Sequence, residues 1–111
     1  MGNKLQEEAV ISILILLSIS DNELHKKERE FIESLISEKS FSIDVDKELD
    51  QIHNKFRDDF DTASTYYINT IQDIQLQKIT IELMRKLAAA DLIVKDREIK
   101  FLELAKRSWK I

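Results

Sequence analysis

The chain has 111 residues and a net charge of −4, and 43% of its residues are hydrophobic while 34% are charged. These values are typical of a single globular domain spanning residues 1–111, long enough to bury a core without cross-links, and they exclude a disordered tail. Cysteine and proline are absent and glycine occurs only at Gly2, which excludes disulfides and thiolate zinc sites and disfavours tight β-hairpins.

The first predicted helix covers residues 4–20 and is apolar nearly all round, as expected of a helix buried on several sides. Its apolar run, residues 9–19, is about half as long as the roughly 20 residues that a membrane-spanning helix needs. The preceding Gln6, Glu7 and Glu8 lack the positive charge that opens a signal peptide. We therefore predict a central buried helix and no transmembrane segment.

Hydrophobic periodicity predicts further helices at residues 26–38, 44–57, 62–71, 76–90 and 96–109, with loops at 37–40 and 57–61. Asp44 is the expected N-cap of helix 44–57, because its short side chain can accept from the free N–H groups of the first turn. The residues expected to point inward are Phe31, Ile32, Leu35 and Ile36; Val45, Leu49, Ile52 and Phe56; Ala63, Tyr67, Ile71 and Ile74; Leu76, Ile79, Leu83 and Leu87; and Phe101, Leu102, Ala105 and Trp109. Of the adjacent Tyr66 and Tyr67, one should join the core and the other lie at the surface.

A pattern near the start of the chain recurs seventy positions later. In each copy an apolar run ends on a small residue and an Asp, a short link follows, and the next helix opens with Glu and continues to Phe. The matching residues are Asp21, Glu28 and Phe31 in the first copy and Asp91, Glu98 and Phe101 in the second. We therefore predict an all-α, compact bundle of about six helices with two pseudo-symmetric helix hairpins, in which the two Phe rings occupy equivalent core positions.

The acidic residues of these two links are the candidate functional groups. Asp21 and Glu28 offer oxygen ligands to a hard divalent cation, and Asp91 and Glu98 form the second candidate metal pair. A structural interpretation of the same residues stays open beside this one. Carboxylates next to a helix N-terminus can cap free N–H groups and complement the helix dipole.

Other polar patterns point to no further site. Asp44, Asp46, Glu48 and Asp50 alternate like the start of a calcium loop, but the required Gly is missing, so we predict a solvated helix face. 

Catalytic patterns are equally absent from the sequence. His25 and His53 have no second His or Cys at ligand spacing. No nucleophile–base arrangement and no phosphate-cradling glycine loop can be assembled. We therefore expect no enzyme, and a divalent metal ion is the one cofactor that stays open.

The repeated motif resembles the TerB-like domain of tellurite-resistance proteins and the related N-terminal region of DjlA-type co-chaperones. That family carries the phrase Ala-Asp-Gly, a short acidic or polar stretch, and Glu. The matching residues here are Ala90, Asp91 and Glu98 in the later copy and Ser20, Asp21 and Glu28 in the earlier one. The resemblance covers nearly the whole chain.

This resemblance implies an all-α module of the tellurite-resistance and stress-response type, with metal-binding acidic links and a role in membrane-associated complexes. The chain departs from the family where Asn22 and Leu92 replace the Gly after each Asp. Asn accepts a left-handed backbone more easily than Leu does, so the second link is expected to follow a different path.

Two functions follow from the sequence. The favoured one is a TerB-like stress-response module with an acidic, cation-binding surface, and the alternative is a non-catalytic protein-interaction or adaptor domain whose acidic residues are structural. Both imply a protein partner, and the negative charge disfavours nucleic acid. The lack of cysteine fits a cytoplasmic location, and a peripheral membrane complex remains compatible with the resemblance.

Overall fold

The computed structural model describes residues 4–18, 26–38, 43–56, 59–90 and 96–111, which form a bundle measuring 34 × 29 × 27 Å. The described residues contain six helices: α1 (Lys4–Ser18), α2 (Lys26–Glu38), α3 (Val45–Phe56), α4 (Phe60–Thr70), α5 (Ile74–Ala90) and α6 (Asp96–Trp109). No strand occurs in the described ranges, so the predicted all-α class is confirmed. 

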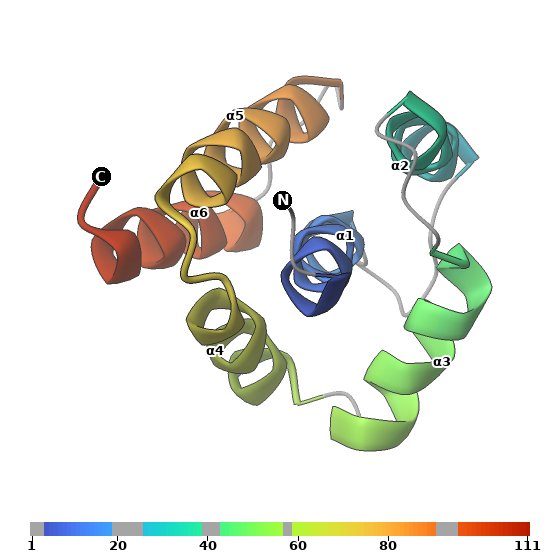
Figure 1. Cartoon of the computed structure of the whole chain (residues 1–111), viewed down its shortest axis with the longest axis horizontal. Helices are drawn as coiled ribbons and strands as arrows, with labels where there is room; N and C mark the ends of the chain where they lie inside the picture. Colours follow the sequence, from blue (N-terminus) through green and yellow to red (C-terminus); the bar gives the residue numbers. More distant parts are fainter. Residues whose placement is uncertain (1–3, 19–25, 39–42, 57–58, 91–95) are drawn as a thin grey trace.

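Helix α1 runs through the centre of the molecule and packs against each of the other five helices (Figure 1). Every side chain from Ala9 to Ser18 is at most 5% exposed, as predicted for a helix that is apolar nearly all round. Fully burying one Leu or Ile side chain contributes about 1.5–3 kcal/mol. Burial of α1 is therefore a large part of what stabilises the fold.

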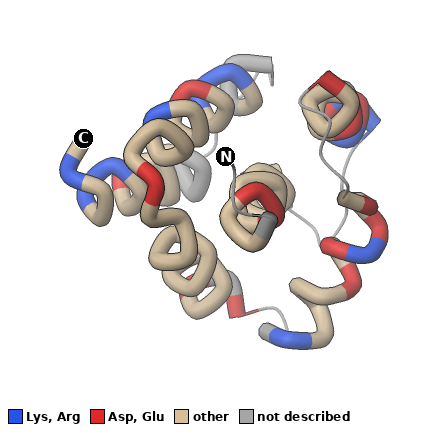
Figure 2. The backbone as a smooth tube through the Cα atoms, in the orientation of Figure 1, with Lys and Arg blue, Asp and Glu red and all other residues tan. Residues whose placement is uncertain are grey.

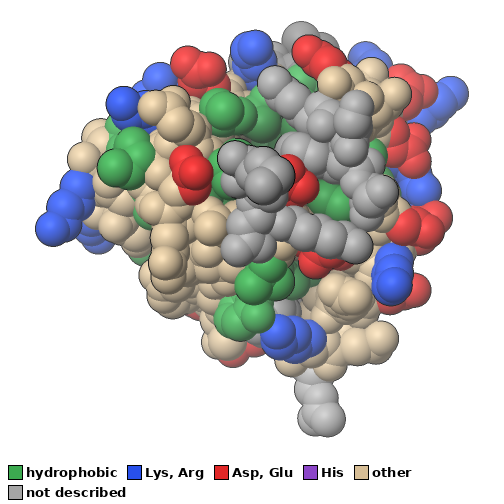
Figure 3. Space-filling model, viewed as in Figure 1, with side chains coloured by type: hydrophobic (Ala, Val, Ile, Leu, Met, Phe, Trp, Pro, Cys, Tyr) green, Lys and Arg blue, Asp and Glu red, His purple; other side chains and the backbone are tan. Residues whose placement is uncertain are grey.

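The surrounding helices carry the charged residues, whereas most of α1 carries none (Figure 2). Charges of both signs alternate around the edge of the face shown in the space-filling view (Figure 3). No helix in the described part of the chain is both long enough and apolar enough to cross a bilayer. 

The inward faces predicted for α2 and α3 are confirmed wherever their side chains are described. Ile32, Leu35, Val45 and Ile52 are buried, and Phe31, Ile36 and Leu49 are partly buried against the same core. Each of these two helices has one apolar face, as its helical spacing of apolar residues predicts, and both helices pack that face toward α1.

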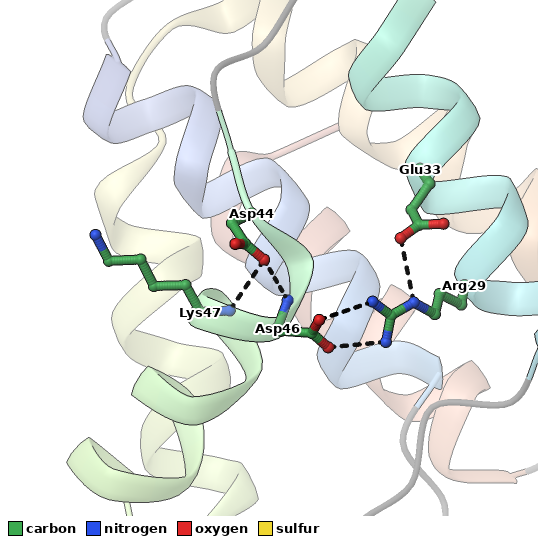
Figure 4. A network of polar contacts seen from close by, with 5 residues as sticks. All are labelled: Arg29, Glu33, Asp44, Asp46 and Lys47. Atoms are coloured by element: carbon green, nitrogen blue, oxygen red, sulfur yellow. Dashed lines mark hydrogen bonds and ion pairs between the residues drawn. The ribbon is translucent and has the colours of Figure 1, made fainter.

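Arg29 of α2 joins the exposed faces of α2 and α3 (Figure 4). Its guanidinium donates two hydrogen bonds to the Asp46 carboxylate, at 2.8 and 3.0 Å, and a third to Glu33 at 3.2 Å. Hydrogen bonding and charge from Arg29 lower the pKa of Asp46 below its ordinary value. The fork geometry links the two helices at their surface, although exposed ion pairs add little stability.

The buried face predicted for α5 is confirmed in part. Leu83 and Leu87 are buried and Leu76 is partly buried, as predicted. Ile74 and Ile79, however, are 63% and 37% exposed, whereas Thr80 is fully buried. The Thr80 hydroxyl donates to the Leu76 carbonyl at 2.6 Å, which satisfies it within its own helix. The inward stripe therefore includes a threonine that the hydrophobic pattern treated as polar, and it also contains Ile81, Leu83, Met84 and Leu87.

Aspartate side chains cap the N-termini of both α3 and α4. Asp44 accepts from the backbone N–H groups of Asp46 and Lys47 at 2.9 and 3.4 Å, which confirms the predicted N-cap (Figure 4). Asp59 caps α4 by accepting from the Thr62 N–H at 3.1 Å. The predicted loop at residues 57–61 is thus wrong at its end, because α4 already begins at Phe60.

Three long-range hydrogen bonds link segments that are distant in the sequence. Gln6 Oε1 accepts from the N–H groups of Gln72 and Asp73, at 3.1 and 3.0 Å, and so ties the turn before α5 to the start of α1. The indole of Trp109 donates to the Ile68 carbonyl at 2.9 Å and ties the end of α6 to α4. 

The two Phe residues of the repeat should differ in their contribution to stability. Phe101 is 2% exposed, whereas Phe31 is only partly buried against the core. We expect Phe101→Ala to cost about 3–5 kcal/mol of unfolding free energy, and Phe31→Ala about half of that, because less apolar surface is lost. Urea unfolding of both variants measures the difference. Equal costs would show that the partial exposure of Phe31 has no energetic consequence.

Candidate functional site

The structure does not test whether the four predicted metal ligands lie together, because the side chains of three of them lie outside the described residues. Asp21 and Asp91 fall in undescribed segments, and Glu98 belongs to α6 but its side chain is not described. Glu28 is described and is only 5% exposed in the first turn of α2. The metal pairs stay predictions.

The burial of Glu28 bears on its role in the acidic link. Its helix neighbours Lys26, Lys27 and Glu30 are all exposed. A carboxylate out of contact with water is costly unless hydrogen bonds or a counter-charge compensate for its lost hydration. Glu28 is therefore more than a solvated charge that complements the helix dipole.

The described residues contain a second, better-defined polar group. Glu48 of α3 is 6% exposed, and its Oε2 accepts a hydrogen bond of 3.0 Å from the Ser12 hydroxyl of α1. This corrects the predicted solvated face, since Asp44, Asp46 and Asp50 are exposed but Glu48 points inward. 

The cause of this inward position is the helical period. Glu48 lies three residues after Val45 and four before Ile52, and both of these residues are buried. It therefore sits on the apolar stripe of α3, although the alternating acids made the whole segment look solvated. The inward position of Glu48 could have been predicted by testing the segment for helical spacing instead of treating its acidic residues as an alternating pattern.

Tyr67 of α4 completes this buried polar group. It is 7% exposed, while Tyr66 is 40% exposed, as expected for adjacent residues on a helix. The two rings meet edge to face with their centroids 5.2 Å apart. A side-chain hydrogen bond with Ser12 places Tyr67 on the same hydroxyl that donates to Glu48.

Burial controls the ionisation of both titratable members. It raises the pKa of Glu48 above its ordinary value of 4.5, with the nearby Glu8 adding to the rise, whereas the Ser12 hydrogen bond and Lys47 oppose it. Burial likewise raises the pKa of Tyr67, and the charges of Glu48, Tyr66 and Glu8 add to that rise. Both shifts favour the neutral forms of these groups.

A cavity of about 120 Å³ lies against this cluster, between α1, α3 and α4. We call it the Glu48 cavity. Its lining includes Leu5, Glu8, Glu48, Lys55, Tyr66 and Tyr67. The Lys55 ammonium lies 3.9 Å from the centre of the Tyr66 ring, so a cation already occupies one aromatic face at the cavity.

This arrangement is suited to binding rather than to nucleophilic chemistry. The Ser12 hydroxyl donates to Glu48, as in a nucleophile–base pair, but Ser12 is 0% exposed and cannot approach a substrate carbonyl. Across the described ranges, no three His, Cys, Asp or Glu side chains gather closely enough to hold a metal ion. The cavity presents carboxyl and aromatic groups to whatever enters it.

Comparison with known proteins adds no family or fold assignment. No protein-family model, no curated protein and no solved structure matches this chain. Functional conclusions therefore rest on the residues and geometry described above.

The raised pKa of Glu48 predicts a pH-dependent stability difference. A carboxyl whose folded pKa exceeds its unfolded value stabilises fully below about 4.5 and loses that contribution as pH rises through the folded pKa. Glu48→Gln removes this titration, so its stability relative to the wild type should increase as pH rises from 4 to 7. Urea unfolding at several pH values measures the trend.

Asp46→Asn provides a control of opposite sign on the same helix. The pKa of Asp46 is lowered by Arg29, so its contribution is present above its ordinary value of 3.8 and lost as pH falls. Relative to the wild type, Asp46→Asn should therefore become less stable as pH rises. Parallel pH trends for the two variants would contradict the assignment of Glu48 as a carboxyl with a raised pKa.

Proposed function

We propose that this chain is a TerB-like helical module of the tellurite-resistance and stress-response type, which acts by binding rather than by catalysis. Its functional surface is formed by the two acidic links, with Asp21 and Glu28 as one cation-binding pair and Asp91 and Glu98 as the other. The protein partner engages this acidic surface. The net charge of −4 supports a preference for cations and basic partners.

The observation that carries this proposal is the burial of Glu28 at the end of the first link. The motif match predicts a functional carboxylate at this position, and the side chain is withdrawn from water to 5% exposure. A surface residue that only complements the helix dipole has no reason to lose its hydration. Carboxylate oxygens are the ligands that a hard divalent cation prefers, which supports the assignment of Glu28 to such a site.

The packing of the helices supports the proposed relation between the two copies of the repeat. α1 contacts α2 and α5 contacts α6, as two helix hairpins would, and α1 and α2 both contact α5. Two hairpins that pack against each other in this way bury the apolar faces that each leaves open. The approximate twofold symmetry and the TerB-like fold are parts of the proposal.

Thermal melts test the cation-binding part of the proposal. If Asp21 and Glu28 form a cation site, Asp21→Asn relieves like-charge repulsion, so the variant should hold or gain stability in the absence of metal. It should lose the stabilisation that calcium, magnesium, manganese or zinc gives the wild type, about 2.7 kcal/mol at a metal concentration 100 times the Kd. Asp50→Asn, on the exposed face of α3, is the matched control and should respond to metal as the wild type does.

Two other results would redirect the proposal. A loss of up to about 2 kcal/mol in Asp21→Asn, with or without metal, would identify Asp21 as a structural cap. Wild-type melting that is indifferent to every divalent ion at millimolar concentration would remove the cation site. The acidic residues would then be structural, and the chain would be an adaptor domain that docks a basic partner.

A further inference from the structure

The Glu48 cavity holds a carboxylate that its own protein surroundings satisfy only in part. Glu48 is more than nine-tenths buried, and its Oε2 accepts from Ser12. Its other carboxylate oxygen has no hydrogen-bond donor among the residues that the structure describes. A buried carboxylate oxygen without a donor is costly, and a group that enters the adjoining cavity can remove that cost.

The charges and rings around the cavity identify the kind of group that fits. Glu8 also lines the cavity and acts on Glu48 as a neighbouring negative charge. The Tyr66 ring supplies an aromatic face, and the 3.9 Å approach of Lys55 shows that this face accepts an ammonium. Carboxylates beside an aromatic face are the surroundings that stabilise an organic cation.

The size and composition of the cavity argue against a bare metal ion. Its lining includes Leu5, Ala9 and the Tyr66 ring, which offer contact surface to an alkyl group but no oxygen ligand to a hard metal ion, apart from the Tyr66 hydroxyl. A volume of about 120 Å³ is that of a few water molecules, each about 30 Å³, and so accommodates a short alkyl chain with a charged end. 

We propose that the Glu48 cavity binds an alkylammonium group, with Glu8 and Glu48 as its counter-charges and the Tyr66 ring as its aromatic wall. The alkyl stem lies against Leu5, which is 57% exposed at the rim of the cavity. The bound ammonium competes with Lys55 for the Tyr66 face. The residues that line this site include none of the four acidic-link residues, so the proposal does not depend on the proposed cation-binding function.

The experiment is an NMR titration of the whole chain with n-butylammonium, followed through the ring signals of Tyr66 and Tyr67. We expect saturable shifts at both rings, and no comparable shifts with n-butanol, which has the same stem without the charge. Equal shifts with the alcohol, or no saturable shift with the amine, would overturn the proposal.

Charge variants at the cavity test how the group is recognised. Glu8→Gln removes a counter-charge and should weaken butylammonium binding roughly 10-fold, whereas Lys55→Gln removes a competing cation and should strengthen it several-fold. Glu7→Gln, one residue earlier on α1 and outside the cavity lining, is the matched control and should leave affinity unchanged. Neither Glu8→Gln nor Lys55→Gln alters the Ser12–Glu48 hydrogen bond, so folding should be preserved. Equal affinities for these two variants would show that charge does not govern binding and would reject the proposal.

A further titration identifies the source of the ammonium. Nα-acetyl-lysine amide carries the same alkylammonium on a peptide backbone. Shifts at Tyr66 and Tyr67 with this compound as strong as those with butylammonium support a lysine side chain of a protein partner. Shifts with butylammonium alone support a free aliphatic amine as the ligand.

Discussion

The burial of α1 on all sides is the constraint on which the rest of the structure depends. A helix whose side chains from Ala9 to Ser18 are all withdrawn from water needs apolar neighbours in every direction, and five helices supply them. The two serines in this run then need partners inside the core. Ser18 donates to the Leu14 carbonyl of its own helix at 2.9 Å, whereas Ser12 donates to Glu48 of α3. The buried polar cluster is thus a consequence of placing a serine in the middle of a central helix.

Much of the fold follows from the sequence because its determinants are local. The near absence of glycine and proline leaves long uninterrupted helices, and the apolar period of each outer helix defines one inward face. Prediction fails where a polar residue belongs to the apolar side: Thr80 of α5 is buried because its hydroxyl donates to a carbonyl within the helix, whereas the neighbouring Ile79, predicted inside, is exposed. It also fails at the start of α4, where Asp59 caps a helix that begins inside a stretch read as loop.

The candidate sites show the same division between local and long-range information. The repeat identifies Asp21, Glu28, Asp91 and Glu98 from motif spacing, but the relative positions of these side chains depend on how the links pass between packed helices. The inward position of Glu48, by contrast, could have been predicted locally, because its helical spacing to Val45 and Ile52 is visible in the sequence. Its partner Ser12 lies 36 positions earlier in the chain, and only packing of α3 against α1 brings the two together. A buried pair at such separation is invisible to any local pattern.

Along the chain, helix α1 connects the Glu48 cavity to the first acidic link. Glu8 lies near the beginning of α1 and Ser12 near its middle, whereas the first acidic link follows Ser18 in the sequence. At about 1.5 Å of rise per residue, Glu8 and Ser18 are separated by about 15 Å along the helix axis. Because α1 takes part in the packing of every other helix, a ligand at either end stabilises the same folded state. The ring signals of Tyr67, which shares the Ser12 hydroxyl with Glu48, report the cavity end alone and therefore separate the two sites.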